Sequence, residues 1–417
     1  MKLTIFKILI LGLLLRLFLA PFTFHSDTID FLNWGRNLEK YGLNGFYARD
    51  TADAGPPNYP PGFYYILFLN QKVYKTTKEI FWNINVNIPL FPSNIYLWLE
   101  SDRGAIFFNK LPAIFADLGI AYLIYKIVHQ IKGKLDALVS SAFFVFSPWV
   151  WYISSVWGQT DSLFALPLLY SFYLLLRGKY TYAPLIFVVS FLIKPTVVLV
   201  APIFLFWWLT KINFSNFIKS TLISLPFFYL AHLMFNQRAT LDWIVNFYIL
   251  DVREISGYLV SNSYNIWSLL YGFIPKPDNF LIYNIPAYFW GIGIFILFVI
   301  YFCLNLKKDT KPKLLFLACA ILSFSGFLFL TGMHERYLFI TLTLLALLVS
   351  FDKKIKITYI ILSLVGLFNL YHFWWIPRFE LLINILSSKL SEQLLVGANV
   401  SVFIWLINHF RKELAKV

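Results

Sequence analysis

Residues 3–22 read LTIFKILILGLLLRLFLAPF, a hydrophobic run long enough to cross a lipid bilayer as an α-helix. Residues 25–30 follow closely and read HSDTID, which places a histidine and two carboxylates next to the end of this run. Acidic groups at a bilayer surface are costly unless they are solvated, paired or used in chemistry. The location of this segment, and the groups that face it, therefore govern the interpretation of the whole chain.

The composition is that of an integral membrane protein. The chain has 417 residues, of which 59% are hydrophobic and 13% are charged, whereas soluble domains carry about 25% charged residues. The net charge is +14, but the lysines fall in short gaps between apolar runs and no RNA-binding motif occurs, so no nucleic-acid partner is expected. Cys303 and Cys319 both lie in apolar runs and form neither a disulfide framework nor a metal motif.

Hydrophobic segments recur along the chain and predict an all-α polytopic membrane protein with about twelve transmembrane helices. No small-residue cleavage site follows the first segment, which we expect to be retained. The two segments around Lys194-Pro195 are short, and they form either two short spans or a broken re-entrant pair. No internal repeat is visible, so residues 1–417 are interpreted as one transmembrane domain. The predicted segments are 3–22, 105–128, 135–153, 161–177, 181–193, 196–210, 218–235, 281–304, 314–331, 337–352, 355–372 and 396–410.

The distribution of lysine and arginine predicts the orientation. With the N-terminus inside, the inner gaps are basic, whereas the short outer gaps 154–160 and 332–336 hold only Arg336 and the turn at 193–196 adds Lys194. Both termini are therefore predicted to be cytoplasmic, in a protein of the cell membrane, and residues 25–104 form a long first outer loop. The inner basic residues are Lys2, Lys7, Lys126, Lys132, Lys134, Arg177, Lys179, Lys211, Lys219, Lys307, Lys308, Lys311, Lys313, Lys353, Lys354, Lys356, Arg411, Lys412 and Lys416.

The first outer loop contains recognisable pieces. Phe31–Leu43 is predicted to be an interfacial amphipathic helix, with Phe31, Trp34 and Leu38 on one side. The sequence NYPPG at 58–62 predicts an extended, rigid turn. Phe63–Leu69 is apolar but too short to span, so it is expected to pack on the bundle or to dip into the interface.

Three outer segments carry candidate chemistry. In the first, Asp27 is a candidate general base that His25 or Asp30 would orient, and the alternative is a helix cap. In the second, residues 155–161 (SVWGQTD), Gln159 and Asp161 are candidates for a binding role, although capping explains Asp161 equally well. In the third, residues 261–267 (SNSYNIW), the amides and aromatic rings suit a sugar, and an ordinary interfacial loop is slightly favoured.

Two outer cationic positions suit a phosphate. Arg336, in the tight turn 333–337 (MHERY), has a fork of donors that matches phosphate oxygens, and His334 adds a donor. A surface pair between Glu335 and Arg336 is the alternative, but three ionisable residues in so short a turn favour function. Lys194 needs an anionic partner in its apolar surroundings, either a phosphate or Asp117.

Other polar residues lie within predicted spans. Lys110 and Asp117 are seven residues apart and share one helix face, and structural pairing inside the bundle is the favoured interpretation of both. No nucleotide-binding loop and no His/Cys metal spacing occur, so an activated donor would have to arrive through the membrane. No metal ligand is assigned, and the sequence is compatible with a divalent metal.

The motifs form an ordered series that resembles the GT-C superfamily of integral-membrane glycosyltransferases, in particular prokaryotic proteins related to the second mannosyltransferase of GPI-anchor assembly. The resemblance covers nearly the whole chain. The series is Asp27, Trp34, Tyr59-Pro60-Pro61, Trp157-Gly158-Gln159-x-Asp161, Leu192-x-Lys194-Pro195, Asn265-x-Trp267 and His334-Glu335-Arg336-Tyr337.

The resemblance implies a GT-C-like bundle that transfers a sugar, expected to be mannose, from a polyprenyl phosphate with inversion on the extracytoplasmic face. Asp27 would be the catalytic base, and the acceptor would be a glycan, a lipid or a protein, the last being less secure because no large soluble C-terminal domain is present. The donor phosphate would be held by Arg336, His334 and Lys194. The sugar or acceptor pocket would be formed by Tyr59, Trp157, Gln159, Asp161, Asn262, Tyr264 and Asn265.

The principal alternative is a transporter or flippase of a lipid-linked or polar solute, motivated by Lys110, Asp117 and Lys194. Against it, transporters commonly contain inverted repeats and bind near the midplane, whereas here no repeat is visible and the strongest polar motifs crowd one face. A non-catalytic assembly subunit is the third interpretation.

Overall fold

A computed structural model describes residues 4–51, 54–236, 239–251, 257–307 and 310–416, and these residues are mostly helical. Lys2, Leu3 and Lys308 of the predicted first span and inner gaps lie outside the described residues. The α-helices are α1 (Ile5–Leu19), α2 (Ser26–Tyr41), α3 (Pro61–Asn87), α4 (Ser93–Glu100), α5 (Asp102–Lys132), α6 (Lys134–Val145), α7 (Pro148–Trp151), α8 (Asp161–Leu176), α9 (Ala183–Ile193), α10 (Ala201–Lys211), α11 (Phe214–Leu233), α12 (Leu241–Asn246), α14 (Ile266–Tyr271), α15 (Ala287–Asn305), α16 (Pro312–Phe329), α17 (Phe339–Ala346), α18 (Lys353–Trp374), α19 (Glu380–Leu386) and α20 (Lys389–Leu414).

Shorter elements connect these helices. The turns η2 and η4 are π-helical, η1, η3 and η5 are 3₁₀ helices, and β1 pairs with β2 as a two-stranded antiparallel hairpin. Their bounds are η1 (Phe46–Ala48), η2 (Tyr152–Trp157), η3 (Pro195–Leu199), η4 (Phe247–Asp251), η5 (Glu335–Leu338), β1 (Leu281–Ile282) and β2 (Ile285–Pro286).

Within the described residues, five helices are long and apolar enough to cross a membrane: α5, α15, α16, α18 and α20. A sixth span results if α6 is combined with the following stretch 148–157, which is bent from it by 46°. The predicted hydrophobic segments do fall on helices, but α8 and α9 have only 16 and 11 residues. The expected count of about twelve spans is therefore not confirmed.

The amphipathic helix expected in the first outer loop is present as α2. Phe31, Trp34 and Leu38 are 5%, 3% and 0% exposed, so the predicted apolar side faces the protein. The helix begins at Ser26 and ends before Gly42, whose φ of 77° stops it.

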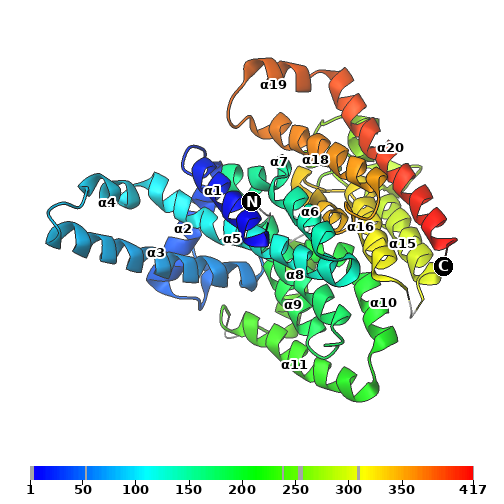
Figure 1. Cartoon of the computed structure of the whole chain (residues 1–417), viewed down its shortest axis with the longest axis horizontal. Helices are drawn as coiled ribbons and strands as arrows, with labels where there is room; N and C mark the ends of the chain where they lie inside the picture. Colours follow the sequence, from blue (N-terminus) through cyan, green and yellow to red (C-terminus); the bar gives the residue numbers. More distant parts are fainter. Residues whose placement is uncertain (1–3, 52–53, 237–238, 252–256, 308–309, 417) are drawn as a thin grey trace.

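The segment Phe63–Leu69 is not a short isolated piece, because α3 continues through polar residues to Asn87 and spans 27 residues. Lys75 and Lys78 on this extension pair with Glu39 and Glu100 at 2.7 and 3.0 Å. In Figure 1, α3 and α4 project together from the side of the bundle.

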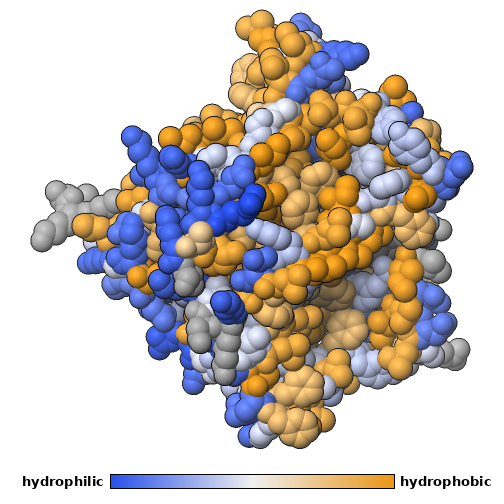
Figure 2. All heavy atoms as spheres, turned by 90° about the vertical axis from the view of Figure 1, so that its right-hand side faces the viewer, coloured by the Kyte–Doolittle hydropathy of each residue, from blue (hydrophilic) through white to orange (hydrophobic). Residues whose placement is uncertain are grey.

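The core lies around α16 and α17, whereas α15 and α20 are peripheral. Every residue of α16 from Leu314 to Leu328 is buried, but Leu297 and Leu304 of α15 are 66% and 78% exposed. Figure 2, viewed from the side on which α15 and α20 lie, shows broad hydrophobic surface with hydrophilic patches. Exposed apolar side chains on long helices are typical of lipid-facing surfaces.

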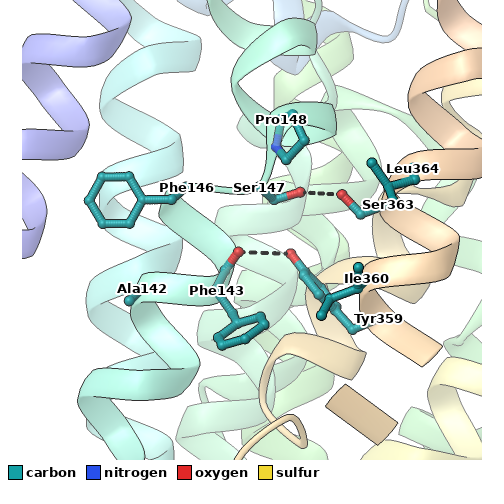
Figure 3. A pocket seen from close by; sticks show the side chains of 9 residues that line it. All are labelled: Ala142, Phe143, Phe146, Ser147, Pro148, Tyr359, Ile360, Ser363 and Leu364. Carbon is teal, nitrogen blue, oxygen red and sulfur yellow. Dashed lines mark hydrogen bonds between the residues drawn. The ribbon is translucent and has the colours of Figure 1, made fainter. Parts of the chain in front are cut away.

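An apolar cavity of about 350 Å³ lies where α6 ends and α7 begins, against α18. Ser147 lies at this break, and its hydroxyl is 2.7 Å from that of Ser363. The Tyr359 hydroxyl donates to the carbonyl of Phe143 at 3.3 Å, so polar groups at the break are paired across to α18 (Figure 3).

Candidate functional site

Asp27 lies in the first turn of α2. The ring of His25 caps the helix, because His25 Nδ1 accepts from the backbone N–H of Asp27 at 3.1 Å. Thr28 donates from its hydroxyl to the carbonyl of His25. The Asp27 carboxylate is not used as a cap, so its side chain is available for other contacts.

The carboxylate of Asp27 receives contacts from two elements. His25 Nδ1 is 3.2 Å from Asp27 Oδ1, and the side-chain amide of Gln159 donates to Oδ2. Burial raises the pKa of Asp27, but the contact with His25 and the positive charge of Arg336 outweigh it, so the pKa lies below the ordinary value. Asp27 is thus ionised at neutral pH, with a side chain that is still 30% exposed.

Gln159 reaches Asp27 because of a sharp turn between η2 and α8. The turn is made by Gly158, whose φ of 92° is in the left-handed region that favours glycine. A Cβ at this position would lie 2.7 Å from Cγ2 of Thr28 and 3.0 Å from Cγ of Lys110. The turn therefore lies directly against the start of α2, and Asp161 follows it as the first residue of α8.

Asp161 is the centre of an ion cluster. Its Oδ1 accepts from Nζ of Lys194 at 2.8 Å, and its Oδ2 lies 3.9 Å from Nε of Arg336. Lys194 was expected to meet a phosphate or Asp117; its partner in the structure is Asp161. The Cβ position of Gly62 lies 2.6 Å from the carbonyl of Leu192, which shows how closely the start of α3 approaches the end of α9 beside this cluster.

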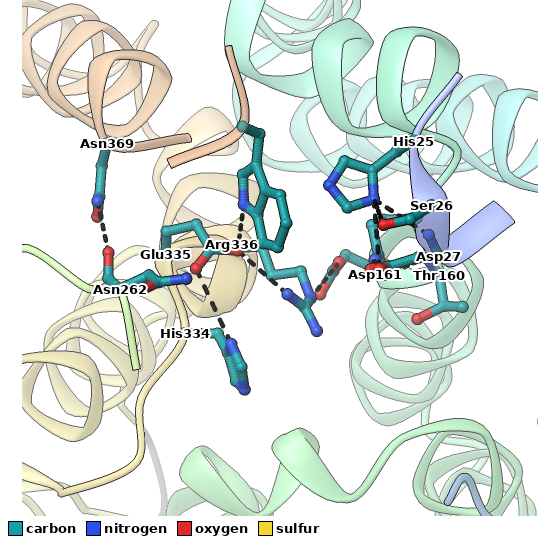
Figure 4. A network of polar contacts seen from close by, with 12 residues as sticks. His25, Ser26, Asp27, Thr160, Asp161, Asn262, His334, Glu335, Arg336 and Asn369 are labelled. Carbon is teal, nitrogen blue, oxygen red and sulfur yellow. Dashed lines mark hydrogen bonds and ion pairs between the residues drawn. The ribbon is translucent and has the colours of Figure 1, made fainter. Parts of the chain in front are cut away.

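The turn 334–336 supplies the other side of the cluster. Arg336 Nη1 donates to Oε1 of Glu335 at 3.1 Å, and Trp374 Nε1 donates to the same oxygen at 3.2 Å. Glu335 is fully buried, so the alternative of a surface pair does not describe it. Figure 4 shows the turn facing Asp161, with His25 and Asp27 beyond.

In the turn 334–336, Arg336 is charged whereas His334 is neutral. Burial would lower the pKa of Arg336, but Glu335 and neighbouring groups raise it above its ordinary value, so the guanidinium stays charged. Burial and the charge of Arg336 hold the pKa of His334 well below its ordinary value, so its imidazole is neutral and has a single N–H donor.

A cavity of about 270 Å³ lies among these groups. Tyr59, Lys194, His334 and Arg336 line it, and the chain segments 58–60, 194–199 and 330–337 form its walls. Several buried polar atoms in and around it have no hydrogen-bond partner among the described residues. They are Asn58 Oδ1, Thr160 Oγ1, Asp161 Oδ2, His334 Nδ1, Glu335 Oε2 and Arg336 Nε. Buried polar atoms are usually paired, so this set is suited to a polar ligand.

Two aromatic rings, those of Trp157 and Trp374, contact both His25 and the turn 334–336. The ring of Trp157 is 4.6 Å from that of His25 and 4.9 Å from that of Trp374, measured between centroids. The guanidinium carbon of Arg336 lies 5.4 Å from the centre of the Trp157 ring. Trp374 was not among the predicted site residues.

Some predicted site residues do not line this cavity. Tyr264 is fully buried, with its hydroxyl 2.8 Å from Nδ1 of His372, and Asn265 caps α14. Asn262 accepts from the side chain of Asn369 through its carbonyl and bridges to His334 by its backbone. Asp30 lies one turn after Asp27, near the backbone of Gly55 rather than in the cluster.

Lys110 and Asp117, which form a polar seam on one face of α5, are both buried and paired with protein groups inside the bundle, as predicted. Asp117 pairs with Arg16 of the first hydrophobic run at 2.8 Å, both side chains being fully buried. Arg16 was overlooked, although an arginine within an apolar run is itself a signal of a buried anion. Lys110 pairs with backbone carbonyls.

Within the described part of the chain, no three His, Cys, Asp or Glu side chains lie close enough together to hold a metal ion. No protein-family model matches the sequence, and no curated protein is significantly similar to it. The function is therefore argued from the site itself.

Proposed function

We propose that this chain is an integral-membrane glycosyltransferase of the GT-C type that transfers a sugar, expected to be mannose, from a polyprenyl phosphate to a hydroxyl acceptor. One observation carries the proposal: a cavity has two cations, Lys194 and Arg336, in its wall, and the carboxylate of Asp27 lies near it, because the Trp157 ring contacts both Arg336 and His25, the residue beside Asp27. The two cations suit a phosphate, and the carboxylate suits the proton of an attacking hydroxyl.

Both cations have donors to spare. Among the described residues, Arg336 donates one hydrogen bond, to Glu335, although a guanidinium has five N–H groups. Lys194 donates one of its three N–H groups, to Asp161. Asp161 and Glu335 thus hold the two cations in place while leaving donors for phosphate oxygens.

The proposed reaction is an inverting displacement. The acceptor oxygen bonds to the anomeric carbon as the bond from that carbon to the phosphate oxygen breaks, and Asp27 takes the proton of the acceptor hydroxyl. The phosphate leaves with the bonding electron pair, and Arg336 and Lys194 stabilise its negative charge. Gln159 orients the carboxylate, and His25 holds the start of the helix that carries it.

The proposed setting is a bundle in the cell membrane with the cavity on the extracytoplasmic side, as the distribution of basic residues predicts. The transporter alternative loses support, because Lys110 and Asp117 are both fully buried and paired with protein groups. Neither faces the cavity that Lys194 lines.

The test uses purified protein, radiolabelled polyprenyl-phosphate-mannose and a panel of glycan, lipid and peptide acceptors. Asp27→Asn keeps the shape and the contact with Gln159 but removes the base, so transfer is expected to fall by about 10²–10⁴-fold. Asp102→Asn, at an exposed aspartate paired with Arg36, is the matched control and should transfer at the wild-type rate. A folded Asp27→Asn protein with full activity would refute the assignment, and sugar movement across sealed vesicles without transfer would favour a transporter.

A further inference from the structure

Lys110 is a fully buried cation without a carboxylate partner among the described residues. Its ammonium donates to the backbone carbonyls of Ala20, Ser155 and Val156 at 3.0, 2.8 and 3.1 Å, and also to that of Thr23. A buried ammonium is costly to desolvate unless its N–H groups are satisfied, and here carbonyl oxygens surround it.

These carbonyls belong to the ends of two helical elements. Ala20 follows the last residue of α1, whereas Ser155 and Val156 lie in the last turn of η2. The final carbonyls of a helix have no partner within it and carry partial negative charge, so a cation is favourable there. One ammonium therefore joins two helix ends that are distant in the sequence.

Each of the two joined segments leads into the candidate site. The chain passes from Thr23 to His25 and Asp27 within four residues, and from Val156 to Gln159 within three. Lys110 also packs against the turn itself, because a Cβ at Gly158 would lie 3.0 Å from its Cγ. The side-chain contact between Gln159 and Asp27 is made just beyond the joined carbonyls.

A second residue of α5, Asp117, also contacts this turn. The carboxylate of Asp117 accepts from the hydroxyls of Ser154 and Ser162, which flank the turn on both sides. Lys110 and Asp117 are seven residues apart, which is about 10.5 Å along the helix. Lys110 therefore contacts the start of the turn 155–161, and Asp117 contacts the residues on both sides of that turn, so α5 holds the turn through two side chains.

We propose that Lys110 is a positioning residue for Asp27: by joining the segment 20–23 to the end of η2, it sets the distance between the carboxylate and Gln159. The inference rests on the proposed function for its kinetic consequence, but not for its structural one. Loss of these hydrogen bonds is expected to lower kcat by about 10²-fold, because a displacement of about 1 Å at a catalytic group has an effect of that size.

The test compares Lys110→Met with wild type, and Lys126→Met, at an exposed position of the same helix, is the control. In Lys110→Met, amide hydrogen exchange should rise in residues 20–28 and 155–161 together, while α16 stays protected. The kcat should fall with an unchanged KM for the lipid donor. If Lys110→Met does not fold, Lys110→Gln, which keeps two N–H donors, should show the same effects at smaller size.

The pH profile separates positioning from a general loss of stability. Activity requires ionised Asp27 and is lost as the pH falls through its pKa. Weakening the hydrogen bond from Gln159 removes a donor that stabilises the ionised carboxylate and so raises this pKa, and the acidic limb should move to higher pH. Unchanged exchange in both segments overturns the inference, as does a fall in activity with an unmoved limb. If wild type transfers no sugar at all, the proposed function fails, and the exchange data alone decide on Lys110.

Discussion

Arg336 has a fork of donors that its protein contacts do not fill. Replacement by lysine keeps the charge but loses the planar arrangement that binds two phosphate oxygens at once. Loss of one hydrogen bond to a charged group is worth about 1.5–3 kcal/mol, so the KM for the lipid donor should rise by about 10–10²-fold in Arg336→Lys.

Steady-state kinetics with varied donor measure this effect. Arg378→Lys is the matched control, because Arg378 is 64% exposed and pairs with Glu380 on the surface. An unchanged donor KM in Arg336→Lys would mean that the guanidinium serves only to neutralise Glu335 and Asp161.

At the scale of the residue, the sequence located polar groups that come together in the structure, but it did not identify their partners. Asp27 and Gln159, from separate motifs, do meet in the structure. Lys194 was given Asp117 as its protein partner, yet it binds Asp161, because the end of α9 packs beside the start of α8. The choice between two buried aspartates depends on helix packing, which local patterns do not contain.

At the scale of the element, the left-handed turn before α8 is sensitive to any side chain. Gly158→Ala is expected to lose about 1–2 kcal/mol of stability from the backbone conformation and about 1–3 kcal/mol more from overlap with Thr28 and Lys110. Thermal unfolding in detergent measures the loss.

Gly178→Ala is the matched control for this prediction. Its φ is also left-handed, at 69°, but a Cβ there meets no atom within 4 Å. It should therefore show only the backbone part of the loss. Equal destabilisation of the two variants would contradict the close approach of the turn to α2 and α5.

Hydrophobic segments located most of the helices, but they did not give their lengths. The segment 181–193 ends at Ile193 as the proline at 195 predicts, and η3 then separates α9 from α10. By contrast, α3 runs far beyond Phe63–Leu69. A helix at the edge of a bundle needs apolar residues only on the side that packs against the protein, and its other positions can be polar.

At the scale of the whole molecule, the proposed orientation can be tested by chemical labelling. In a protein whose Cys303 and Cys319 are replaced by alanine, single cysteines can be placed at Leu381 in α19 and Leu135 in α6, which are 76% and 79% exposed. Leu381→Cys should react with a membrane-impermeant maleimide in intact cells, whereas Leu135→Cys should react only after permeabilisation. The reverse pattern would place the candidate site on the cytoplasmic side.

The pairing of Arg16 with Asp117 has a consequence for the order in which the protein is made. The two residues are 101 positions apart, so α1 leaves the ribosome well before its counter-charge in α5 exists. Arg16 lies in the last turn of α1, where an arginine in a membrane helix costs less than the about 2.5–3.5 kcal/mol that it costs at the centre, but it has no counter-charge until α5 is made. At about 5–20 residues per second, roughly 5–20 s of synthesis separate the two helices. We therefore expect α1, as the first predicted span, to complete its insertion only when α5 arrives.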